Sequence, residues 1–238
     1  MTCTTPKVTI VTVCRNAVES LRKTMQSVEH QTYKEMEYIV VDGASTDGTL
    51  QFLAHYQGRL TRWISEHDQG IYDAMNKAIR MATGEWVIFL NAGDTFVSAD
   101  ILTRIFSRPR HADVIYGDVV KGGRIKRATP PHNAHRMYFC HQSCLTHISC
   151  LREYPFDTAH AMSADLKLYK QLFKARKSFL QLPLAIAHFD TTGVSNTSRS
   201  KGLRDNIQVV REIDGLMDQL RFLPRLYFVY WLCKLRNK

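Results

Sequence analysis

Residues 65–94 read SEHDQGIYDAMNKAIRMATGEWVIFLNAGD and contain two regular patterns in succession. In the first, apolar residues recur three or four positions apart, which predicts a helix over 70–83 that Gly84 ends. The apolar face of this helix comprises Ile71, Met75, Ala78, Ile79 and Ala82. Residues 86–90 are apolar throughout, as expected of a strand buried in a parallel sheet. A helix followed directly by such a strand indicates an α/β fold.

The residues before this stretch repeat the same alternation. Strands are predicted at 8–13, 37–42 and 63–66, with a helix after each of the first two. Asn16 is expected to cap the first helix. Repeated strand–helix units predict a parallel, doubly wound sheet that binds its ligand at the carboxyl ends of its strands.

The pattern is less regular after residue 110. The predicted elements are strands at 114–120 and 180–189, a helix at 164–175 and a hairpin turn at Gly122-Gly123. Residues 128–160 are expected to be rich in loops, and the tail from Arg204 to be helical with an interruption at Pro224.

Composition excludes several classes of protein. The 238 residues are 45% hydrophobic and 23% charged, which is typical of a globular domain and not of a disordered chain. No apolar run reaches the roughly 18 residues of a membrane-spanning helix. Six cysteines and no recognisable signal peptide favour a cytoplasmic protein with free thiols over a disulfide scaffold.

The net charge of +10 is unevenly distributed. Residues 1–103 hold 9 basic and 12 acidic side chains, whereas residues 104–238 hold 23 and 10. The basic second half predicts an anionic partner, and charge alone leaves nucleic acid, a lipid surface and a phosphorylated substrate open.

Carboxylates follow three successive predicted strands. Asp42 ends the second strand, Glu66 and Asp68 follow the third, and Asp94 follows the fourth. Because the carboxyl ends of parallel strands meet at one edge of the sheet, we expect these side chains to form a ligand site. Asp94, preceded by small residues, is suited to Mg²⁺ or Mn²⁺ held partly by substrate phosphates.

Two common nucleotide-binding motifs are absent from this edge. The loop Gly43–Thr49 superficially resembles a phosphate-binding loop, but Asp47 stands where such a loop has Lys. No G-x-G-x-x-G follows the first strand, which disfavours a dinucleotide-binding domain. Asp47 is interpreted as a turn residue or helix cap.

Three blocks in this order, TIVTVCRN (9–16), IVVDGASTDGT (39–49) and the stretch 65–94, resemble the inverting glycosyltransferase family 2. The resemblance is closest to the branch that builds bacterial exopolysaccharides and O-antigens, including colanic-acid fucosyltransferase-like proteins. It implies a GT-A fold, a Rossmann-like, mostly parallel sheet flanked by helices. A thinner resemblance continues through Ser163-Ala164-Asp165 and Gly193-Val194-Ser195.

The resemblance also implies roles for individual residues. Asp165 would be the general base that deprotonates the acceptor hydroxyl, and Asp94 would bind the metal, with His188 as a further candidate ligand. The donor-side residues would be Thr12, Arg15, Asp42, Asp68, Asn76, Lys77 and Asn91. His141 and Gln142 would line the acceptor side. Asn91 and Gly93 replace acidic residues of many family members, so metal binding would depend mainly on Asp94.

The implied activity is transfer of one sugar from a UDP- or GDP-linked donor to a saccharide acceptor, in surface polysaccharide assembly. No Q-x-x-R-W motif of processive synthases is present. The expected divisions are a domain over 1–200, with a nucleotide-sugar half (1–120) and an acceptor half (121–200), and a basic helical extension over 201–238. Acceptors in this branch are usually polyprenyl-diphosphate-linked sugars on the cytoplasmic face of the inner membrane.

Basic and aromatic residues alternate in the tail from Arg221 to Lys238. Such a tail is typical of a helix at an anionic membrane surface, and packing on the domain or in a homodimer remains the alternative. A sugar nucleotidyltransferase and a nucleic-acid-binding protein are the rival functions, although neither the Gly-rich loop of the first nor a motif of the second is found. The cysteines and histidines of 140–150 lack the paired spacing of a zinc site.

Overall fold

The computed structural model describes residues 5–192 and 199–236, so Gly193-Val194-Ser195 lies outside the described residues. The first half alternates strands and helices. Its elements are β1 (Val8–Cys14), α1 (Val18–Glu29), β2 (Met36–Asp42), α2 (Thr49–His55), β3 (Arg62–Ser65), α3 (Ile71–Met81) and β4 (Trp86–Phe89). Every strand and helix predicted before residue 90 is therefore confirmed, with small shifts at the ends.

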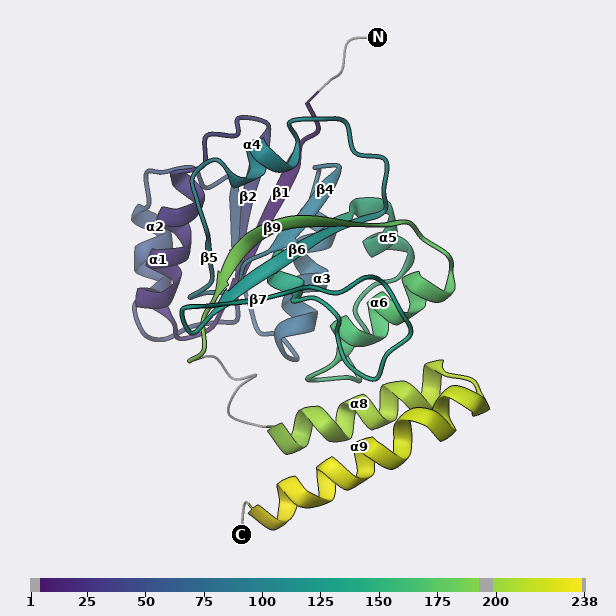
Figure 1. The fold of residues 1–238 in the computed structure, drawn as a ribbon. Helices are drawn as coiled ribbons and strands as arrows, with labels where there is room; N and C mark the ends of the chain where they lie inside the picture. The colour runs from purple at the N-terminus through teal and green to yellow at the C-terminus, as the bar shows by residue number, and fades with distance from the viewer. Residues whose placement is uncertain (1–4, 193–198, 237–238) are drawn as a thin grey trace.

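The second half is more irregular, as expected. Its elements are β5 (Thr95–Phe96), α4 (Ile101–Ile105), β6 (Val114–Lys121), β7 (Arg124–Lys126), the 3₁₀ turn η1 (His141–Ser143), β8 (Cys144–His147), α5 (Ile148–Glu153), α6 (Ala164–Lys174), β9 (Phe179–Phe189), α8 (Arg199–Ile213) and α9 (Leu216–Arg236). Figure 1 shows the helices around one sheet, with the α8–α9 hairpin beside α6.

The sheet has the order β3-β2-β1-β4-β8-β6-β9-β5, with β7 paired to β6. The pairings among β1, β2, β3 and β4 are parallel, as predicted. Beyond β4 the sheet is mixed, because β8 runs antiparallel to both of its neighbours. The sequence interpretation missed β8, a strand of four residues inside the segment read as loop.

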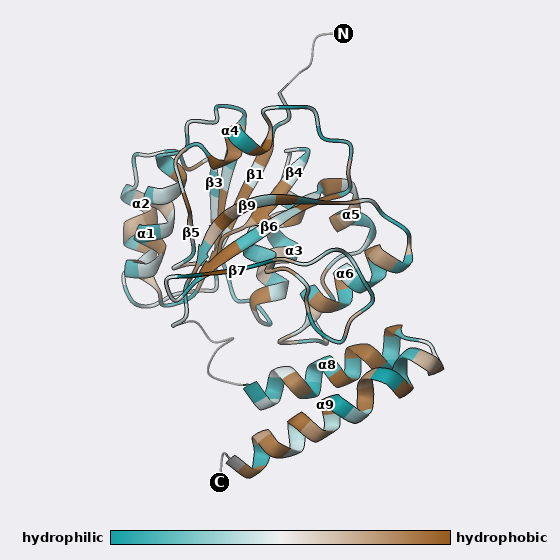
Figure 2. Cartoon of the chain, in the orientation of Figure 1, coloured by the Kyte–Doolittle hydropathy of each residue, from teal (hydrophilic) through white to brown (hydrophobic). Residues whose placement is uncertain are grey.

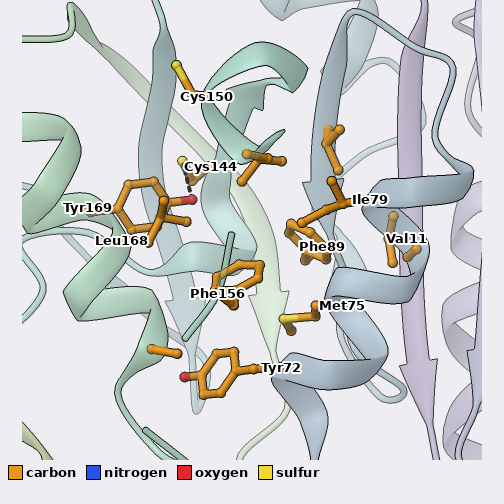
Figure 3. Packing of buried hydrophobic residues seen from close by; sticks show 14 of the residues in the cluster. Val11, Tyr72, Met75, Ile79, Phe89, Cys144, Cys150, Phe156, Leu168 and Tyr169 are labelled. Carbon is orange, nitrogen blue, oxygen red and sulfur yellow. Dashed lines mark hydrogen bonds between the residues drawn. The ribbon is translucent and has the colours of Figure 1, made fainter. Parts of the chain in front are cut away.

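Alternating residues of the central strands pack on opposite faces of the sheet, as period-two geometry requires. Val11, Ile39 and Phe89 join a cluster with α3, α5 and α6, which Figure 3 shows with Met75 and Ile79. Their neighbours in the strands pack on the other face against α1, α2 and α4. Both faces are covered, which explains why β1 and β4 are buried along their whole length and why hydrophobic residues predominate in β1 (Figure 2).

Three local predictions were wrong. Asn16 does not cap α1: its backbone is left-handed (φ 48°), Ala17 is the N-cap, and the Asn16 Oδ1 accepts from the Thr46 amide at 2.8 Å. Gly84 does not end α3, whose C-cap is Ala82. Instead a Cβ at Gly84 would lie 2.7 Å from the Thr9 nitrogen, so glycine is required there by close approach to β1.

Pro224 also differs from the prediction, because it lies within α9 and does not interrupt it. Phe222 and Leu226, on either side of it, are buried against Ile207 and Val210 of α8. Packing between the two helices therefore holds α9 continuous across a residue that contributes no backbone N–H. α8 begins at Arg199, and the domain boundary at residue 200 stays a prediction.

A buried carboxylate joins the strands at the edge opposite the predicted ligand site. Glu37 at the start of β2 accepts from the Thr9 hydroxyl at 2.5 Å and from the Gly84 amide at 3.0 Å. It also accepts from the Thr83 amide and hydroxyl and pairs with Lys7 at 3.2 Å. Burial raises the pKa of Glu37, but the hydrogen bonds outweigh burial and lower the pKa to about 2.

We expect Glu37→Gln to lower the free energy of unfolding by about 2 kcal/mol at pH 7. The carboxyl pKa is about 2 in the folded chain and roughly 4.3 when unfolded. The ionised form therefore stabilises fully above pH ~4.3, and this contribution is lost as pH falls through 2. Urea unfolding at pH 7 and at low pH measures it, with Glu19→Gln as control because the Glu19 side chain is 78% exposed. A difference between wild type and Glu37→Gln that stays constant with pH would contradict the assignment.

Candidate functional site

The carboxyl ends of β1, β2 and β3 form one side of the site. Asp42 is completely buried at the end of β2, opposite Cys14 of β1 and Ser65 of β3. Its carboxylate accepts from the Ser45 amide at 2.9 Å, the Ser45 hydroxyl and the Ser65 hydroxyl at 2.7 Å. In this structure Asp42 orders the turn that follows β2, and its role toward a base stays a prediction.

The turn after β2 is fixed by short side chains. Asp47 accepts from the Thr49 hydroxyl at 2.6 Å, which lowers the pKa of Asp47, and from the Val18 amide of α1 at 3.1 Å. Its interpretation as a turn residue is thereby confirmed. Thr12 is buried in β1 and accepts from the Tyr38 hydroxyl at 2.9 Å, whereas Arg15 is exposed just beyond β1.

Asp68 reaches the same edge from the loop after β3. A Cβ at Gly43 would lie 3.3 Å from the Asp68 Cγ and 3.4 Å from the Arg15 Cβ, so the two side chains meet over Gly43. The Asp68 carboxylate also accepts from the Gly70 amide at 2.9 Å. The predicted convergence of carboxylates is thus present for Asp42 and Asp68.

Two predicted donor-side residues on α3 are engaged elsewhere. Lys77 donates to the His67 carbonyl at 2.6 Å and pairs with Glu66 at 3.0 Å, which holds the loop containing Asp68. The Asn76 amide makes two hydrogen bonds with the backbone of Phe156, at 2.7 and 3.0 Å. The structure therefore gives Asn76 a structural contact, and its role in donor binding is a prediction only.

Asp94 lies between β4 and β5 and is 3% exposed. Its carboxylate accepts from the Asp190 amide at 2.8 Å and from the Asn91 amide at 3.2 Å. Burial raises the pKa of Asp94 to about 6, although the Asp190 amide, His141 and Gln142 act in the opposite direction. The hydrogen bonds to Asp94 do not offset the cost of burying its negative charge, and a bound cation would offset that cost.

Two buried polar atoms close to Asp94 have no hydrogen-bond partner among the described residues. They are the Oδ1 of Asn91 and the Nε2 of His141. Buried polar atoms are rarely left unpaired, so these two indicate a place for a polar ligand.

Asp165 lies in the first turn of α6 and receives three hydrogen bonds. Its Oδ1 accepts from the Tyr72 hydroxyl at 3.0 Å and the Leu166 amide at 2.8 Å, and its Oδ2 from the His141 Nδ1 at 3.2 Å. Burial raises the pKa of Asp165, but the His141 hydrogen bond and charge outweigh it, and the pKa lies below its usual value. Asp165 is therefore ionised at neutral pH and is not the cap of α6, which is Ser163.

His141 links the two carboxylates, because it bonds to Asp165 and acts electrostatically on Asp94. His188 is exposed on β9 opposite Thr95, and it lines a cavity of about 170 Å³ with Gly93 and Asp190. His188 therefore lies near Asp94, but the structure gives no direct contact between the two side chains.

Two residues of this centre were missed by sequence reasoning. Tyr72 was passed over because Ile71 was assigned to the apolar face of α3, but Ile71 is 40% exposed and Tyr72 is buried (Figure 3). Asp190 follows the last strand of the sheet, and a search for carboxylates at strand ends beyond β4 would have found it. A Cβ added at Gly93 would overlap the Asp190 side chain, so the backbone at Gly93 lies in close contact with Asp190.

The cysteine–histidine segment holds no zinc cluster among the described residues, and every described cysteine is a free thiol. Cys144 contacts the Tyr169 hydroxyl at 3.4 Å, and Cys150 contacts Asp113 at 3.7 Å. In the described ranges one group has the geometry to hold a metal ion, Asp157, His160 and Glu212. The ammonium of Lys167 lies 2.5 Å from Asp157 and 2.6 Å from Glu212, so a cation already fills it.

Similar proteins of known sequence are glycosyltransferases by name. The PGL/p-HBAD biosynthesis glycosyltransferase of Mycobacterium bovis (strain BCG / Pasteur 1173P2) is 33% identical over 148 residues, 58% of this chain and 58% of that protein. The putative glycosyltransferase EpsE of Bacillus subtilis (strain 168) is 26% identical over 162 residues, 62% of this chain and 58% of that protein. The chain thus spans less than two thirds of the length of these relatives.

Similar solved structures share the fold. Staphylococcus aureus TarS 1–349 in complex with UDP-GlcNAc superposes with a TM-score of 0.69 at 18% identity, over 88% of this chain and 68% of that one. The Pyrobaculum calidifontis mannosyltransferase PcManGT, in complex with GDP-Man and Mn²⁺, gives 0.67 at 18% identity, over 88% and 64%. The predicted GT-A fold is confirmed.

The family is established by the sequence match itself. The model of glycosyl transferase family 2 covers residues 9–188, which is more than half of the chain and includes β1 through His188 of β9. The matched residues contain Asp42, Asp94 and Asp165. The chain belongs to glycosyl transferase family 2.

Proposed function

We propose that the chain is an inverting, non-processive glycosyltransferase that moves one sugar from a nucleotide-sugar donor to a saccharide acceptor. The observation that carries this proposal is that Asp165 is held by hydrogen bonds from Tyr72 and His141, while the same His141 acts electrostatically on the buried Asp94. An ionised carboxylate that can accept a proton, linked through His141 to a carboxylate suited to a cation, is the pair of groups that this reaction needs.

Asp165 is the proposed general base. Its Oδ1 already receives two hydrogen bonds and its Oδ2 one, so Oδ2 has more capacity to accept the proton of the acceptor hydroxyl. As that proton moves to Asp165, the acceptor oxygen bonds to the anomeric carbon and the bond from that carbon to the diphosphate oxygen breaks. Attack opposite the leaving group inverts the anomeric configuration.

His141 is proposed to contact the acceptor. Since an ionised Asp165 cannot donate, the Nδ1 of His141 carries the proton of their hydrogen bond. With Nδ1 engaged in this way, Nε2 is left for a further hydrogen bond, and this buried atom has no partner among the described residues. A hydroxyl of the acceptor sugar supplies the missing partner. Gln142 is buried next to His141 in the chain, and its side-chain hydrogen bond acts to lower the pKa of Asp94.

The residues around Asp94 fit a divalent cation. Asp94 and the unpaired Oδ1 of Asn91 are oxygen ligands of the kind that Mg²⁺ and Mn²⁺ prefer, and we propose that they hold one, with His188 as a further candidate. When bound, the ion neutralises charge on the departing diphosphate.

The donor is proposed to lie along the ends of β1 to β3, against Thr12, Arg15, Asp42 and Asp68, with Lys77 fixing the loop of Asp68. The related folds bind UDP-GlcNAc and GDP-Man, which supports a nucleotide-sugar donor and leaves both UDP and GDP open. We further propose that the transfer belongs to assembly of bacterial surface polysaccharide, in the colanic-acid fucosyltransferase-like branch, on a polyprenyl-diphosphate-linked acceptor.

Calorimetry with UDP and GDP, each with and without Mn²⁺, tests the donor site. We expect Mn²⁺ to strengthen binding of one nucleotide, and Asp94→Asn to weaken that metal-dependent binding more than about tenfold because the charge is removed at nearly constant shape. Asp100→Asn, exposed at the start of α4, is the matched control. If neither UDP nor GDP binds, the result would contradict the proposal and favour the nucleic-acid-binding alternative.

Asp165→Asn tests the base. The variant keeps an oxygen for the Tyr72 hydrogen bond but cannot take a proton, so kcat should fall by about 10²–10⁴-fold with nucleotide affinity unchanged. Steady-state kinetics and calorimetry on the same preparation measure the two quantities. A kcat within a few-fold of wild type would remove Asp165 from this role.

The α8–α9 hairpin carries a surface suited to an anionic membrane. Among the described residues no helix has the length and hydrophobicity to cross a bilayer. One face of α9 nevertheless exposes large apolar side chains at helical spacing, whereas Phe222 and Leu226 on the other face pack on α8. The exposed residues are Leu216, Met217, Leu220, Tyr227, Phe228, Trp231 and Leu235.

Exposed basic side chains flank this apolar face. Arg221, Arg225 and Lys234 lie beside it along the helix. An apolar face bordered by positive charge matches the chemistry of a lipid surface with anionic headgroups, and we propose that α9 binds the membrane peripherally on its cytoplasmic face. A homodimer through the same face is the alternative.

We expect Phe228→Ser combined with Trp231→Ser to abolish binding to vesicles of phosphatidylcholine and phosphatidylglycerol. Trp63→Ser combined with Ile125→Ser removes exposed apolar side chains elsewhere and should bind as wild type does. Vesicle sedimentation gives the bound fraction, and light scattering gives the oligomeric state. Unchanged vesicle binding by the α9 variant would contradict the proposal, and loss of a dimer would favour the alternative.

A further inference from the structure

The segment that leads into Asp165 is held by α8. The Met162 amide donates to the Asp205 carboxylate at 2.8 Å, and the Ser163 hydroxyl donates to the Asn206 side chain at 2.6 Å. Asp165 follows Ser163 by two residues, so α8 fixes the backbone immediately before the proposed base.

His160 is the centre of this contact. Its ring is completely buried, with Nδ1 2.7 Å from Asp205 and Nε2 2.9 Å from Glu212. These two carboxylates lie seven residues apart and therefore on one face of α8. A ring held at both nitrogens cannot rotate or shift without breaking a charged hydrogen bond.

Lysines on α6 extend the contact past Asp165. Lys167 pairs with Asp157 and Glu212, and it lowers the pKa of Glu212 to about 2. Lys170, 5% exposed, pairs with the buried Asp214 at 2.7 Å. The helix that carries Asp165 is thus tied to the hairpin on both sides of the base, through charges that the described reaction centre does not use.

We infer that Asp205 of α8, together with His160, is a positioning element for Asp165, acting on the base through the backbone of 160–163. The expected change in kcat rests on the proposed function, whereas the expected loss of order before Asp165 does not. Loss of the Asp205 carboxylate frees both the His160 Nδ1 and the Met162 amide. The backbone before Asp165 is then less firmly held, and the position of the Asp165 carboxylate depends on its hydrogen bonds with Tyr72, His141 and the Leu166 amide alone.

Asp205→Ala tests this inference, with Asp205→Asn as the conservative variant. We expect kcat to fall by about 10²-fold in the alanine variant, with donor KM and nucleotide affinity unchanged, since misplacement of a base affects the chemical step. The asparagine variant, which keeps an acceptor oxygen, should recover much of the activity. Asp218→Ala is the control, because Asp218 contacts Asn133 in another loop at 2.7 Å.

Hydrogen exchange at the Met162 amide is measured on the same variants without substrate. Asp205→Ala should accelerate this exchange, and Asp218→Ala should not. An unchanged exchange rate would overturn the inference, as would an unchanged kcat or a parallel loss of nucleotide binding. If no donor supports turnover, the proposed function fails while the exchange result still decides whether α8 orders this segment.

Discussion

The antiparallel pairing of β8 with β4 is the constraint on which the candidate site depends. Its register joins Trp86 to His147 and Ile88 to Leu145, so the chain before β8 runs back along the end of β4. The 3₁₀ turn η1, which directly precedes β8, therefore contacts β4, and from it Gln142 and His141 act on Asp94 while His141 bonds to Asp165. One short strand therefore brings His141 to two carboxylates, Asp94 and Asp165, that are distant from each other in the sequence.

The first half of the fold could be predicted because β1, β2 and β4 are buried along nearly all their length and are rich in apolar and β-branched residues. β8 could not, since Cys144–His147 is four residues long and its neighbours in the sheet are distant in sequence. The carboxylates at strand ends were found from topology alone. The contact of Tyr72 with Asp165 joins residues far apart in the sequence and leaves no local pattern, whereas Asp190 follows a predicted strand and was missed only because the search stopped at β4.

The positive side chains in the second half of the sequence form two groups in the structure, one paired with acidic side chains of the same chain and one exposed. Lys167, Lys170 and Lys174 lie on one face of α6 and pair with acidic side chains of the described chain, so they are not available to an anionic partner. The exposed Arg221 and Arg225 of α9 are better placed for one. The basic second half of the sequence thus contains lysines that hold α6 against the α8–α9 hairpin and, separately, arginines that lie on the surface.

The contacts between α6 and α8 also constrain the order in which the molecule can mature during synthesis. Asp157, His160 and Lys167 leave the ribosome well before Glu212, and until α8 follows, these charged groups have no partner from that helix. The sheet from β1 to β4 has all its strands by residue 89 and can pack earlier. The strands β1 to β4 are therefore complete in the nascent chain well before α8 can hold the segment that precedes Asp165, so a product truncated before Asp205 would lack the hydrogen bonds that order this segment.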